Sequence, residues 1–345
     1  MQELRRDQIS QHEIVTNLFT GRMRHYLANL TQQSHAALWD RYTEHVGDHA
    51  DSVFRRYDYE PKPTATTYCS SMQCARHVWY GAHLTEKSDP ADWRGQHTFE
   101  MGYQVECWIK ALLDVIGAKY GTHVGYELAW ELPPYGRIYV GPDIANLFIT
   151  DDDADFVLGG WTPMQCHVIG EIKSASAKAF DTIAREGLQS AKPNYYSQCQ
   201  LGMYGAGADV CVTIIMCKNT GRLHEIWVTH DGAHIAELDE LFYNTHVTEL
   251  DQLERRALEP IEKYHRGKTK PADATGPLRE NRNKNDRLIG WYEVVDHILS
   301  WQCGYCPWRT RCWSTTHDID VTLEKGKPPV YHVTERPTPP TKELF

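Results

Sequence analysis

Three cysteines close to the carboxyl end restrict the possible folds of this chain more than any other feature. Cys303, Cys306 and Cys312 are spaced x2 and x5 among aromatic residues and arginines. Cys-x2-Cys is a typical spacing of metal ligands, and thiolate sites usually have four ligands. Cys74, more than two hundred residues upstream, is the candidate for the fourth ligand. Such a centre requires a fold that brings the two ends of a large domain together.

The composition indicates a globular protein. Apolar residues make up 41% of the 345 residues and charged residues 24%, which suits one large domain, or one domain with an appendage. The sequence has neither an 18-residue apolar run nor an apolar signal-peptide stretch, so we expect a cytoplasmic protein without a membrane span. Ten cysteines then indicate buried thiols or metal ligands. The expected core thiols are Cys107, Cys166, Cys199, Cys211 and Cys217.

The charge distribution is uneven. The formal net charge is −10, which is unusual for a protein that binds DNA, because cations placed against phosphates supply much of DNA affinity. Residues 263–287, however, contain eight Lys and Arg against three Asp and Glu. A basic surface can therefore exist within an acidic protein.

The order of expected elements predicts the fold class. Residues 1–60 have helical periodicity, and an apolar stripe predicts a helix over 99–116. Strand-like segments follow, and 167–173 is the clearest of them. We then expect a helix over 192–204, a hairpin of 210–217 with 223–228, a long helix over 232–264 and a mobile basic loop over 265–287. This order predicts an α/β fold with a central mixed β-sheet flanked by helices.

The strand at 167–173 contains the residues with the clearest chemistry. Glu171 and Lys173 are two residues apart, so their side chains share one face of a strand while Ile172 points into the core. The carboxylate could bind Mg²⁺ while the ammonium orients or helps to deprotonate a water, an arrangement that suits phosphodiester hydrolysis. Taken alone, the pair is more often a solvated salt bridge.

Other carboxylates precede this strand. Asp155 begins the segment Asp-Phe-Val-Leu, which ends at a glycine turn, and a hairpin would bring it beside Glu171. Asp143 is the rival, with a longer connection, and we favour Asp155. Glu106 lies within the apolar helix, where an isolated carboxylate needs a partner and a metal would be one. The alternative for Glu106 is an ordinary position on the helix surface.

The following helix contains Gln200 and Tyr204, which are four residues apart and therefore share one face. An ordinary amphipathic helix would give the same pattern.

In this order the motifs resemble the PD-(D/E)XK nuclease superfamily, in its RecB-like and phage-exonuclease branch. They are Glu106, Asp155, Glu171-Ile-Lys173 and Gln200-Leu-Gly-Met-Tyr204. The phage-exonuclease pattern also fits Tyr196-Ser-Gln198, so Gln198 could take the role of the glutamine. The resemblance covers residues 66–313. It implies a restriction-endonuclease-like core and a Mg²⁺- or Mn²⁺-dependent DNA nuclease, expected to be an exonuclease of recombination, repair or phage DNA processing.

The resemblance also implies a role for each motif residue. Glu106, Asp155 and Glu171 would bind the metal. Lys173 would position and activate the attacking water, while Gln200 and Tyr204 would support the site or the strand.

The cysteines resemble the iron–sulfur staple of AddB-type helicase-nucleases and of CRISPR-adaptation nucleases. Cys74-Ala-Arg76, followed by aromatic residues, fits the upstream ligand better than Cys69, although alanine replaces the usual proline. The resemblance implies a structural [4Fe–4S] cluster, with Zn²⁺ as the alternative. The expected organisation is an N-terminal helical region (1–60), a nuclease domain closed by the cysteines (61–313) and an extended tail (314–345).

Two further functions remain open from the sequence. One is a catalytically inactive member of the same fold that binds DNA or docks on a partner, and the other is a zinc-stapled RNA-processing nuclease. For the active enzyme we expect single-stranded DNA or duplex ends as substrate, a helicase or recombination protein as a possible partner, and the cytoplasm of a bacterium or of a phage-infected host as location. The sequence contains no helicase motif.

Overall fold

The computed structural model describes most of the chain in two units, each treated separately below. The described residues are 12–56, 69, 74–83, 85–89, 93–121, 126–128, 138–148, 167–253, 259–266, 269–274, 277–283, 286–299, 303, 306–313, 317–322 and 330–335. The first unit spans residues 1–85 and 93–253, and the second spans 86–92 and 254–345. Neither boundary coincides with the expected divisions at residues 61 and 313.

A six-stranded mixed sheet forms the centre of the first unit, in the order β1-β8-β7-β6-β5-β2. Only β6 and β7 run parallel, and the other neighbours are antiparallel. The strands are β1 (Glu13–Thr16), β2 (Lys119–Gly121), β5 (Ile144–Phe148), β6 (Val168–Ala175), β7 (Val210–Cys217) and β8 (Leu223–Thr229). A separate pair joins β3 (Tyr126–Leu128) to β4 (Ile138–Val140). The expected α/β class with a central mixed sheet is confirmed.

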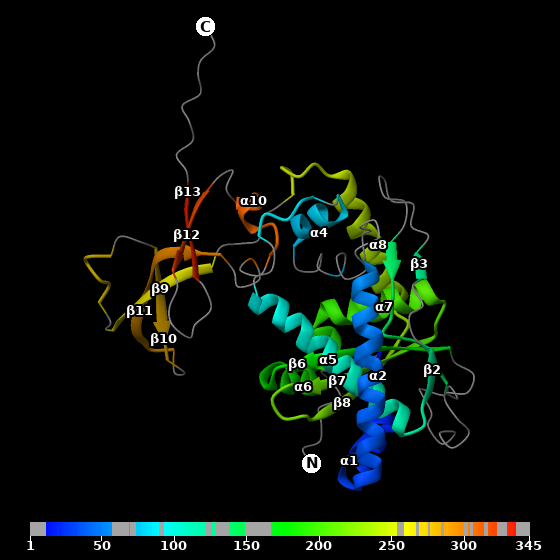
Figure 1. Ribbon diagram of the computed structural model, residues 1–345. Coiled ribbons are helices and arrows are strands. Elements are labelled where there is room, and N and C mark those ends of the chain that lie inside the picture. The colour runs from blue at the N-terminus through cyan, green and yellow to red at the C-terminus, as the bar shows by residue number, and fades with distance from the viewer. Residues whose placement is uncertain are drawn as a thin grey trace. The chain divides into compact units, whose positions relative to one another are not determined.

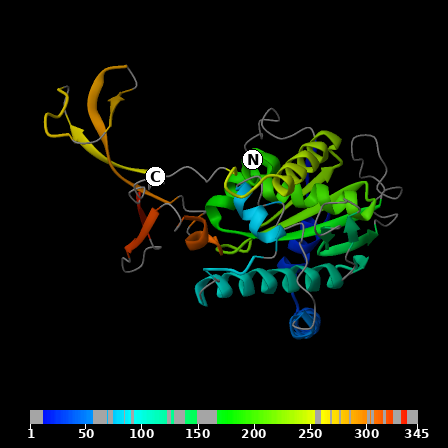
Figure 2. The same cartoon turned by 90° about the horizontal axis from the view of Figure 1, so that it is seen from above.

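Helices cover both faces of this sheet (Figures 1 and 2). One face carries α1 (Leu18–Ala28), α2 (Gln32–Arg56) and α5 (Trp93–Val115), while α6 (Ala177–Ala191) and α7 (Pro193–Ala206) cover the other. Outside α7, α8 (Gly232–Val247) packs with α4 (Ala75–Ala82). The expected helices at 99–116 and 192–204 correspond to α5 and α7. No helix in the described ranges is long and apolar enough to cross a membrane.

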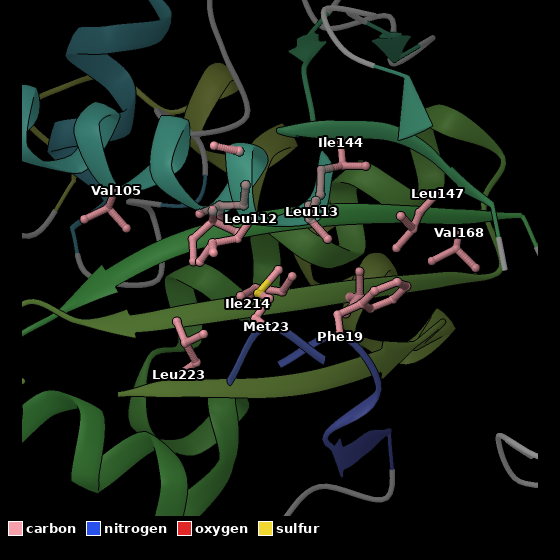
Figure 3. Close-up of a cluster of buried hydrophobic side chains, with 14 of the residues drawn as sticks. Phe19, Met23, Val105, Leu112, Leu113, Ile144, Leu147, Val168, Ile214 and Leu223 are labelled. Atoms are coloured by element: carbon pink, nitrogen blue, oxygen red, sulfur yellow. The ribbon is translucent and has the colours of Figure 1, made fainter. Parts of the chain in front are cut away.

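The two cores follow from the alternation of side chains along the strands. On the α5 face, Leu112 and Leu113 pack with Ile144, Leu147 and Val168 (Figure 3). On the α7 face the buried side chains come from β6, β7, β8 and the two helices; they include Ile169, Cys199, Met203, Cys211 and Ile215. Both cores bury apolar side chains against β6, so this strand is fixed from both sides.

The second unit contains a five-stranded antiparallel sheet. Its strands are β9 (Glu259–Arg266), β10 (Leu278–Arg282), β11 (Leu288–Ile298), β12 (His317–Thr322) and β13 (Val330–Glu335). β11 pairs with β9, β10 and β13, and β12 pairs with β13. The short helix α10 (Arg309–Trp313) lies between β11 and β12 in the chain.

Three expected elements differ from the structure in this part of the chain. The long helix predicted over 232–264 ends at Val247, and 259–266 is strand β9. Pro260 disfavours a helix interior, because its ring removes a hydrogen-bond donor and clashes with the preceding turn. The basic segment 265–287, predicted to be a loop, contains the end of β9 and all of β10. The segment expected as an extended tail contains the paired strands β12 and β13.

Candidate functional site

The candidate site begins on β6, the strand that sequence alternation identified. Ile172 belongs to the core against α5, and Glu171 and Lys173 point to the opposite face. Lys173 donates a hydrogen bond to Glu171. Glu171 is only 5% exposed, so this carboxylate is held in a largely dry environment. Since β6 is hydrogen-bonded to β5 and β7, its backbone fixes where both charged groups lie.

Asp143 joins this pair from the residue before β5. Its Oδ2 accepts a hydrogen bond from the backbone N–H of Ile172 at 2.7 Å and lies 3.9 Å from Nζ of Lys173. The cause is the antiparallel pairing of β5 with β6, in which Ile144 is opposite Gly170. Asp143 therefore lies where the sequence analysis placed Asp155, which is outside the described residues.

The charges of Asp143, Glu171 and Lys173 influence one another's protonation. Burial and the nearby carboxylates of Glu171 and Glu106 raise the pKa of Asp143 to about 7, against the opposing effects of Lys173 and the Ile172 N–H. Burial lowers the pKa of Lys173, but Glu171 and Asp143 outweigh it, and the net pKa is above its ordinary value. Lys173 is therefore an ammonium at neutral pH, whereas Asp143 changes between its protonated and ionised forms near that pH.

Glu106 contributes negative charge from α5. Its Oε1 accepts a hydrogen bond from Nζ of Lys110, one helical turn away, at 2.6 Å. The side chain is one-quarter exposed, while that of Lys110 is buried. After burial and Glu171, the negative charge of Glu106 also contributes to the raised pKa of Asp143. Sequence reasoning did not identify Lys110.

Helix α7 presents Tyr195 to the site, which the sequence analysis also missed. The Nζ of Lys173 lies over its ring, 5.6 Å from the centroid, and Nζ of Lys192 lies 5.9 Å away. Gln198 is three residues further on, so it lies on the same face of the helix as Tyr195. The only sequence signal for Tyr195 was its place one turn before Gln198.

Gln200 has a different environment. Its Nε2 donates to the carbonyl of Thr229 and its Oε1 accepts from the N–H of Asp231, both at 2.9 Å. The side chain is fully buried, and the two bonds join α7 to the chain between β8 and α8. Tyr204, four residues later, is 46% exposed. The structure thus does not place the amide of Gln200 with Glu171 and Lys173.

Several buried thiols belong to the core of the first unit. Cys69 is 1% exposed and belongs to the core around Val78 and Leu201. Burial raises its pKa well above the ordinary value, and Glu171 raises it further. Cys199 lies 3.2 Å from Oγ1 of Thr213, and burial with a hydrogen bond to Cys199 raises the pKa of Cys211. The thiols of Cys69 and Cys211 are therefore difficult to ionise.

The cysteine segment of the second unit folds locally. The N–H of Cys306 donates to the carbonyl of Cys303 at 3.0 Å, and the N–H of Cys312 donates to Trp308 at 2.8 Å. Asp89 holds this segment: its carboxylate accepts from the side chain of Arg309 and from the backbone N–H of Thr310, both part of α10. Cys74 immediately precedes α4 in the first unit. Cys303 and Cys312 are buried and Cys306 is partly exposed.

Across the residues that the structure describes, no three His, Cys, Asp or Glu side chains form a group that could hold a metal ion. This holds for the carboxylates and for the cysteine segment.

Comparisons with known proteins give the following. No family model matches the sequence, and no curated protein matches it either. An alkaline exonuclease from Laribacter hongkongensis (LHK-Exo) is similar in structure at 17% sequence identity and a TM-score of 0.36, over 54% of this chain and 86% of that one. The same exonuclease in complex with dAMP gives 16% identity and a TM-score of 0.37. SSO0001 gives 14% identity and a TM-score of 0.35, over 66% of this chain and 82% of that one.

Proposed function

We propose that this chain is a metal-dependent nuclease that hydrolyses phosphodiester bonds in DNA. The observation that carries the proposal is the grouping of Asp143, Glu171 and Lys173 at the start of β5 and along β6. Two carboxylates and one ammonium from neighbouring strands are the side chains needed to hold a hard cation next to a phosphate. In this proposal Asp143 takes the role that the sequence analysis gave to Asp155.

The donor set fits Mg²⁺ or Mn²⁺. Mg²⁺ usually binds through one or two carboxylates and keeps several waters or substrate phosphate oxygens, so a site without a third close ligand suits it. Asp143 and Glu171 would hold the ion, and Glu106 would assist directly or through a water. The pKa of Asp143 is raised first by burial and then by repulsion from Glu171, and a bound cation would offset both effects, which supports this assignment. When bound, the ion supplies an activated water and polarises a phosphoryl oxygen.

Lys173 acts as a hydrogen-bond donor. Its pKa is raised, so it keeps its proton at neutral pH and is a poor base. Its ammonium can orient the attacking water and stabilise the charge that develops on the phosphate oxygens. The ring of Tyr195 limits where Nζ can move. We assign Lys173 to orientation and charge stabilisation, and not to proton removal.

The glutamine of the motif is better assigned to Gln198. It shares a face of α7 with Tyr195, whereas both ends of the Gln200 amide are bonded to backbone groups. Gln198 would therefore orient substrate or water, Gln200 would be a positioning residue for α7, and Tyr204, which is half-exposed, would contact the strand.

The finer description follows the family resemblance. We propose exonuclease action on single-stranded DNA or duplex ends, in recombination, repair or phage DNA processing, with a helicase or recombination protein as partner. The inactive alternative is not favoured, because both carboxylates and the lysine are present and in contact.

We also propose that Cys74, Cys303, Cys306 and Cys312 hold a [4Fe–4S] cluster, with Zn²⁺ as the alternative. The local fold of the cysteine segment in the second unit supports this proposal. Cys69 is less suitable, because burial in the core keeps its thiol protonated.

The cluster is tested by colour and thermal stability. Anaerobically purified protein should be brown, and Cys74→Ala or Cys306→Ala should remove the colour and lower Tm, while Cys69→Ala keeps the colour. A colourless protein with one zinc would replace the cluster by zinc. Colour lost with Cys69→Ala and kept with Cys74→Ala would move the ligand to Cys69.

The nuclease proposal is tested by digesting 5′- and 3′-labelled single- and double-stranded DNA with Mg²⁺ or Mn²⁺. We expect cleavage that EDTA stops, with mononucleotides or short products released from one labelled end. Lys173→Ala is the matched control for a contaminating nuclease. Absence of cleavage with either ion on all four substrates, or equal cleavage by the variant, would refute the proposal.

A further inference from the structure

The second unit has an exposed sheet face that combines aromatic rings with arginines. β11 is flanked by β9 and β10 (Figure 1). The register of these strands places Tyr292 opposite Tyr264 on one side and opposite Arg279 on the other. Directly opposite residues project to the same face of a sheet. Arg266 and Asn281, two residues further along their strands, also lie on this face. We call Tyr264, Tyr292, Arg279 and Arg266 the tyrosine–arginine platform.

The groups of the platform stack on one another. The rings of Tyr264 and Tyr292 have centroids 5.2 Å apart, and the guanidinium of Arg279 lies 4.8 Å from the centroid of Tyr292. Tyr264 is 44% exposed and the Arg279 side chain is 66% exposed. Glu262 forms an ion pair with Arg279 at 2.9 Å. Tyr264 and Arg279 are therefore the exposed groups of this stack, and Tyr292 is partly buried between them.

The orientation of Tyr264 is determined by the sheet. A Cβ at position 290 would lie 2.5 Å from its ring and 2.6 Å from the carbonyl of His265, so Gly290 gives the ring room to lie across β11. The hydroxyl of Tyr264 donates to the carbonyl of Ile289 at 3.2 Å. A ring fixed in this way loses little freedom when another flat group stacks on it.

The charge of the region indicates an anionic partner. Residues 263–287 contain eight Lys and Arg and three Asp and Glu, a net charge of +5 in a chain whose net charge is −10. Single-stranded nucleic acid offers both phosphates for the cations and bases for the rings. An acidic peptide would satisfy the cations but would leave exposed aromatic rings without a flat partner.

We propose that the tyrosine–arginine platform binds single-stranded DNA, by stacking bases on Tyr264 and placing phosphates against Arg279 and Arg266. The inference goes beyond the proposed hydrolysis, because the platform lies in the second unit and contains none of the residues assigned to the reaction.

The test measures binding of fluorescently labelled oligothymidylate to the full chain in EDTA, by anisotropy at several salt concentrations. EDTA removes the divalent ions that hydrolysis would require, so the assay measures binding alone. A failure of the nuclease proposal therefore leaves the binding result unaffected. Tyr264→Ala should weaken binding about fivefold or more, and Tyr264→Phe, which keeps the ring, should bind like the unaltered chain. Arg279→Ala should also weaken binding and reduce the slope of log K against log salt by about 0.7.

Lys263→Ala is the matched control. Lys263 is opposite Glu293 in the register and so projects from the other face of the same sheet. Lys263→Ala nevertheless removes one positive charge, as Arg279→Ala does. Its effect should be smaller than that of Arg279→Ala. The proposal is overturned if the unaltered chain does not bind oligothymidylate, if Tyr264→Ala binds as well as Tyr264→Phe, or if Lys263→Ala weakens binding as much as Arg279→Ala. Circular dichroism of each variant identifies any loss of fold, and the exposed Arg279 keeps the test informative if Tyr264→Ala does not fold.

Discussion

Two sites on the same central sheet contain buried carboxylates, but they differ in the number of hydrogen-bond donors and of like charges around each carboxylate. Glu225, on β8, is fully buried, and hydrogen-bond donors surround it. Three of them are the backbone N–H groups at the start of α1, which no helical carbonyl can satisfy. The donors are Thr16 Oγ1 (2.5 Å), Leu18 N (3.2 Å), Phe19 N (2.9 Å), Thr20 N (2.8 Å) and Trp227 Nε1 (2.7 Å).

Asp143 and Glu171 have fewer donors and more like charge. Asp143 accepts from one backbone N–H, and both carboxylates share Lys173. Repulsion from Glu171 and Glu106 adds to burial in raising the pKa of Asp143 to about 7. Burial of an acid therefore does not by itself indicate function. A carboxylate saturated by donors joins elements of the fold, whereas carboxylates left in mutual repulsion indicate a place for a cation.

Loss of Lys173 should have the largest effect on activity. Lys173→Ala or Glu171→Ala should reduce DNA cleavage by about 10²-fold or more. The first removes the ammonium that stabilises charge in the transition state, and the second removes a carboxylate proposed to hold the metal ion. The measurement is the initial cleavage rate with Mg²⁺ at matched protein concentration. Near-normal cleavage by Lys173→Ala would remove the nuclease assignment from this strand.

The two aspartates can be separated in the same assay. Asp143→Asn should reduce cleavage strongly, though less than Lys173→Ala does, and Asp155→Asn should have a smaller effect. Asp143→Asn should not lower Tm at pH 8, since the amide oxygen can still accept from Ile172 and a repulsive charge is lost. The reverse order of activities would return Asp155 to the site, as the sequence alone suggested.

Glu225 should show the opposite combination. Glu225→Ala leaves several buried donors without an acceptor and should cost about 3 kcal/mol or more of unfolding free energy. Chemical denaturation at pH 7 measures this loss. Cleavage by the fraction that remains folded should be unchanged, and a stable but inactive variant would contradict the division between the two sites.

The smallest contrast concerns the glutamines of α7. Gln198→Ala should slow cleavage roughly tenfold, the lower range for loss of a positioned hydrogen-bonding group. Gln200→Ala should instead lower stability by about 1–3 kcal/mol, since the N–H of Asp231 loses its buried acceptor. Tm and cleavage rates of both variants decide between the two roles. A stable, inactive Gln200→Ala would show that the motif glutamine is Gln200.

Local patterns predicted much of this arrangement. The alternation of Glu171, Ile172 and Lys173 fixes their faces once the segment is a strand, because side chains alternate along any strand. The apolar periodicity of α5 and α7 was equally local. The pairing of β5 with β6 is not: a run of 19 residues, 149–167, lies between the two strands, and no local signal sets their register. A preference for the shorter connection therefore selected Asp155.

Two other differences have the same origin. Gln200 carries the motif spacing, but its environment depends on the turn between β8 and α8, which is distant in sequence. Beyond Val247, apolar residues at helical intervals predicted that the helix continues. In the structure, residues 259–266 instead form strand β9, which pairs with β11. The alternation of Tyr264 and Arg266 is visible in the sequence, but a hairpin partner more than twenty residues away is needed to interpret it.

The measurement that tests the central claim most directly is binding of Mn²⁺ to the full chain, by titration calorimetry between pH 5.5 and 8.5. Because the metal competes with the proton on Asp143, affinity should fall as the pH decreases below about 7 and level off above it. Asp143→Asn should weaken binding at pH 8 and remove this pH dependence, while Glu225→Gln should bind Mn²⁺ as the unaltered chain does. Unchanged Mn²⁺ binding by Asp143→Asn would contradict the account.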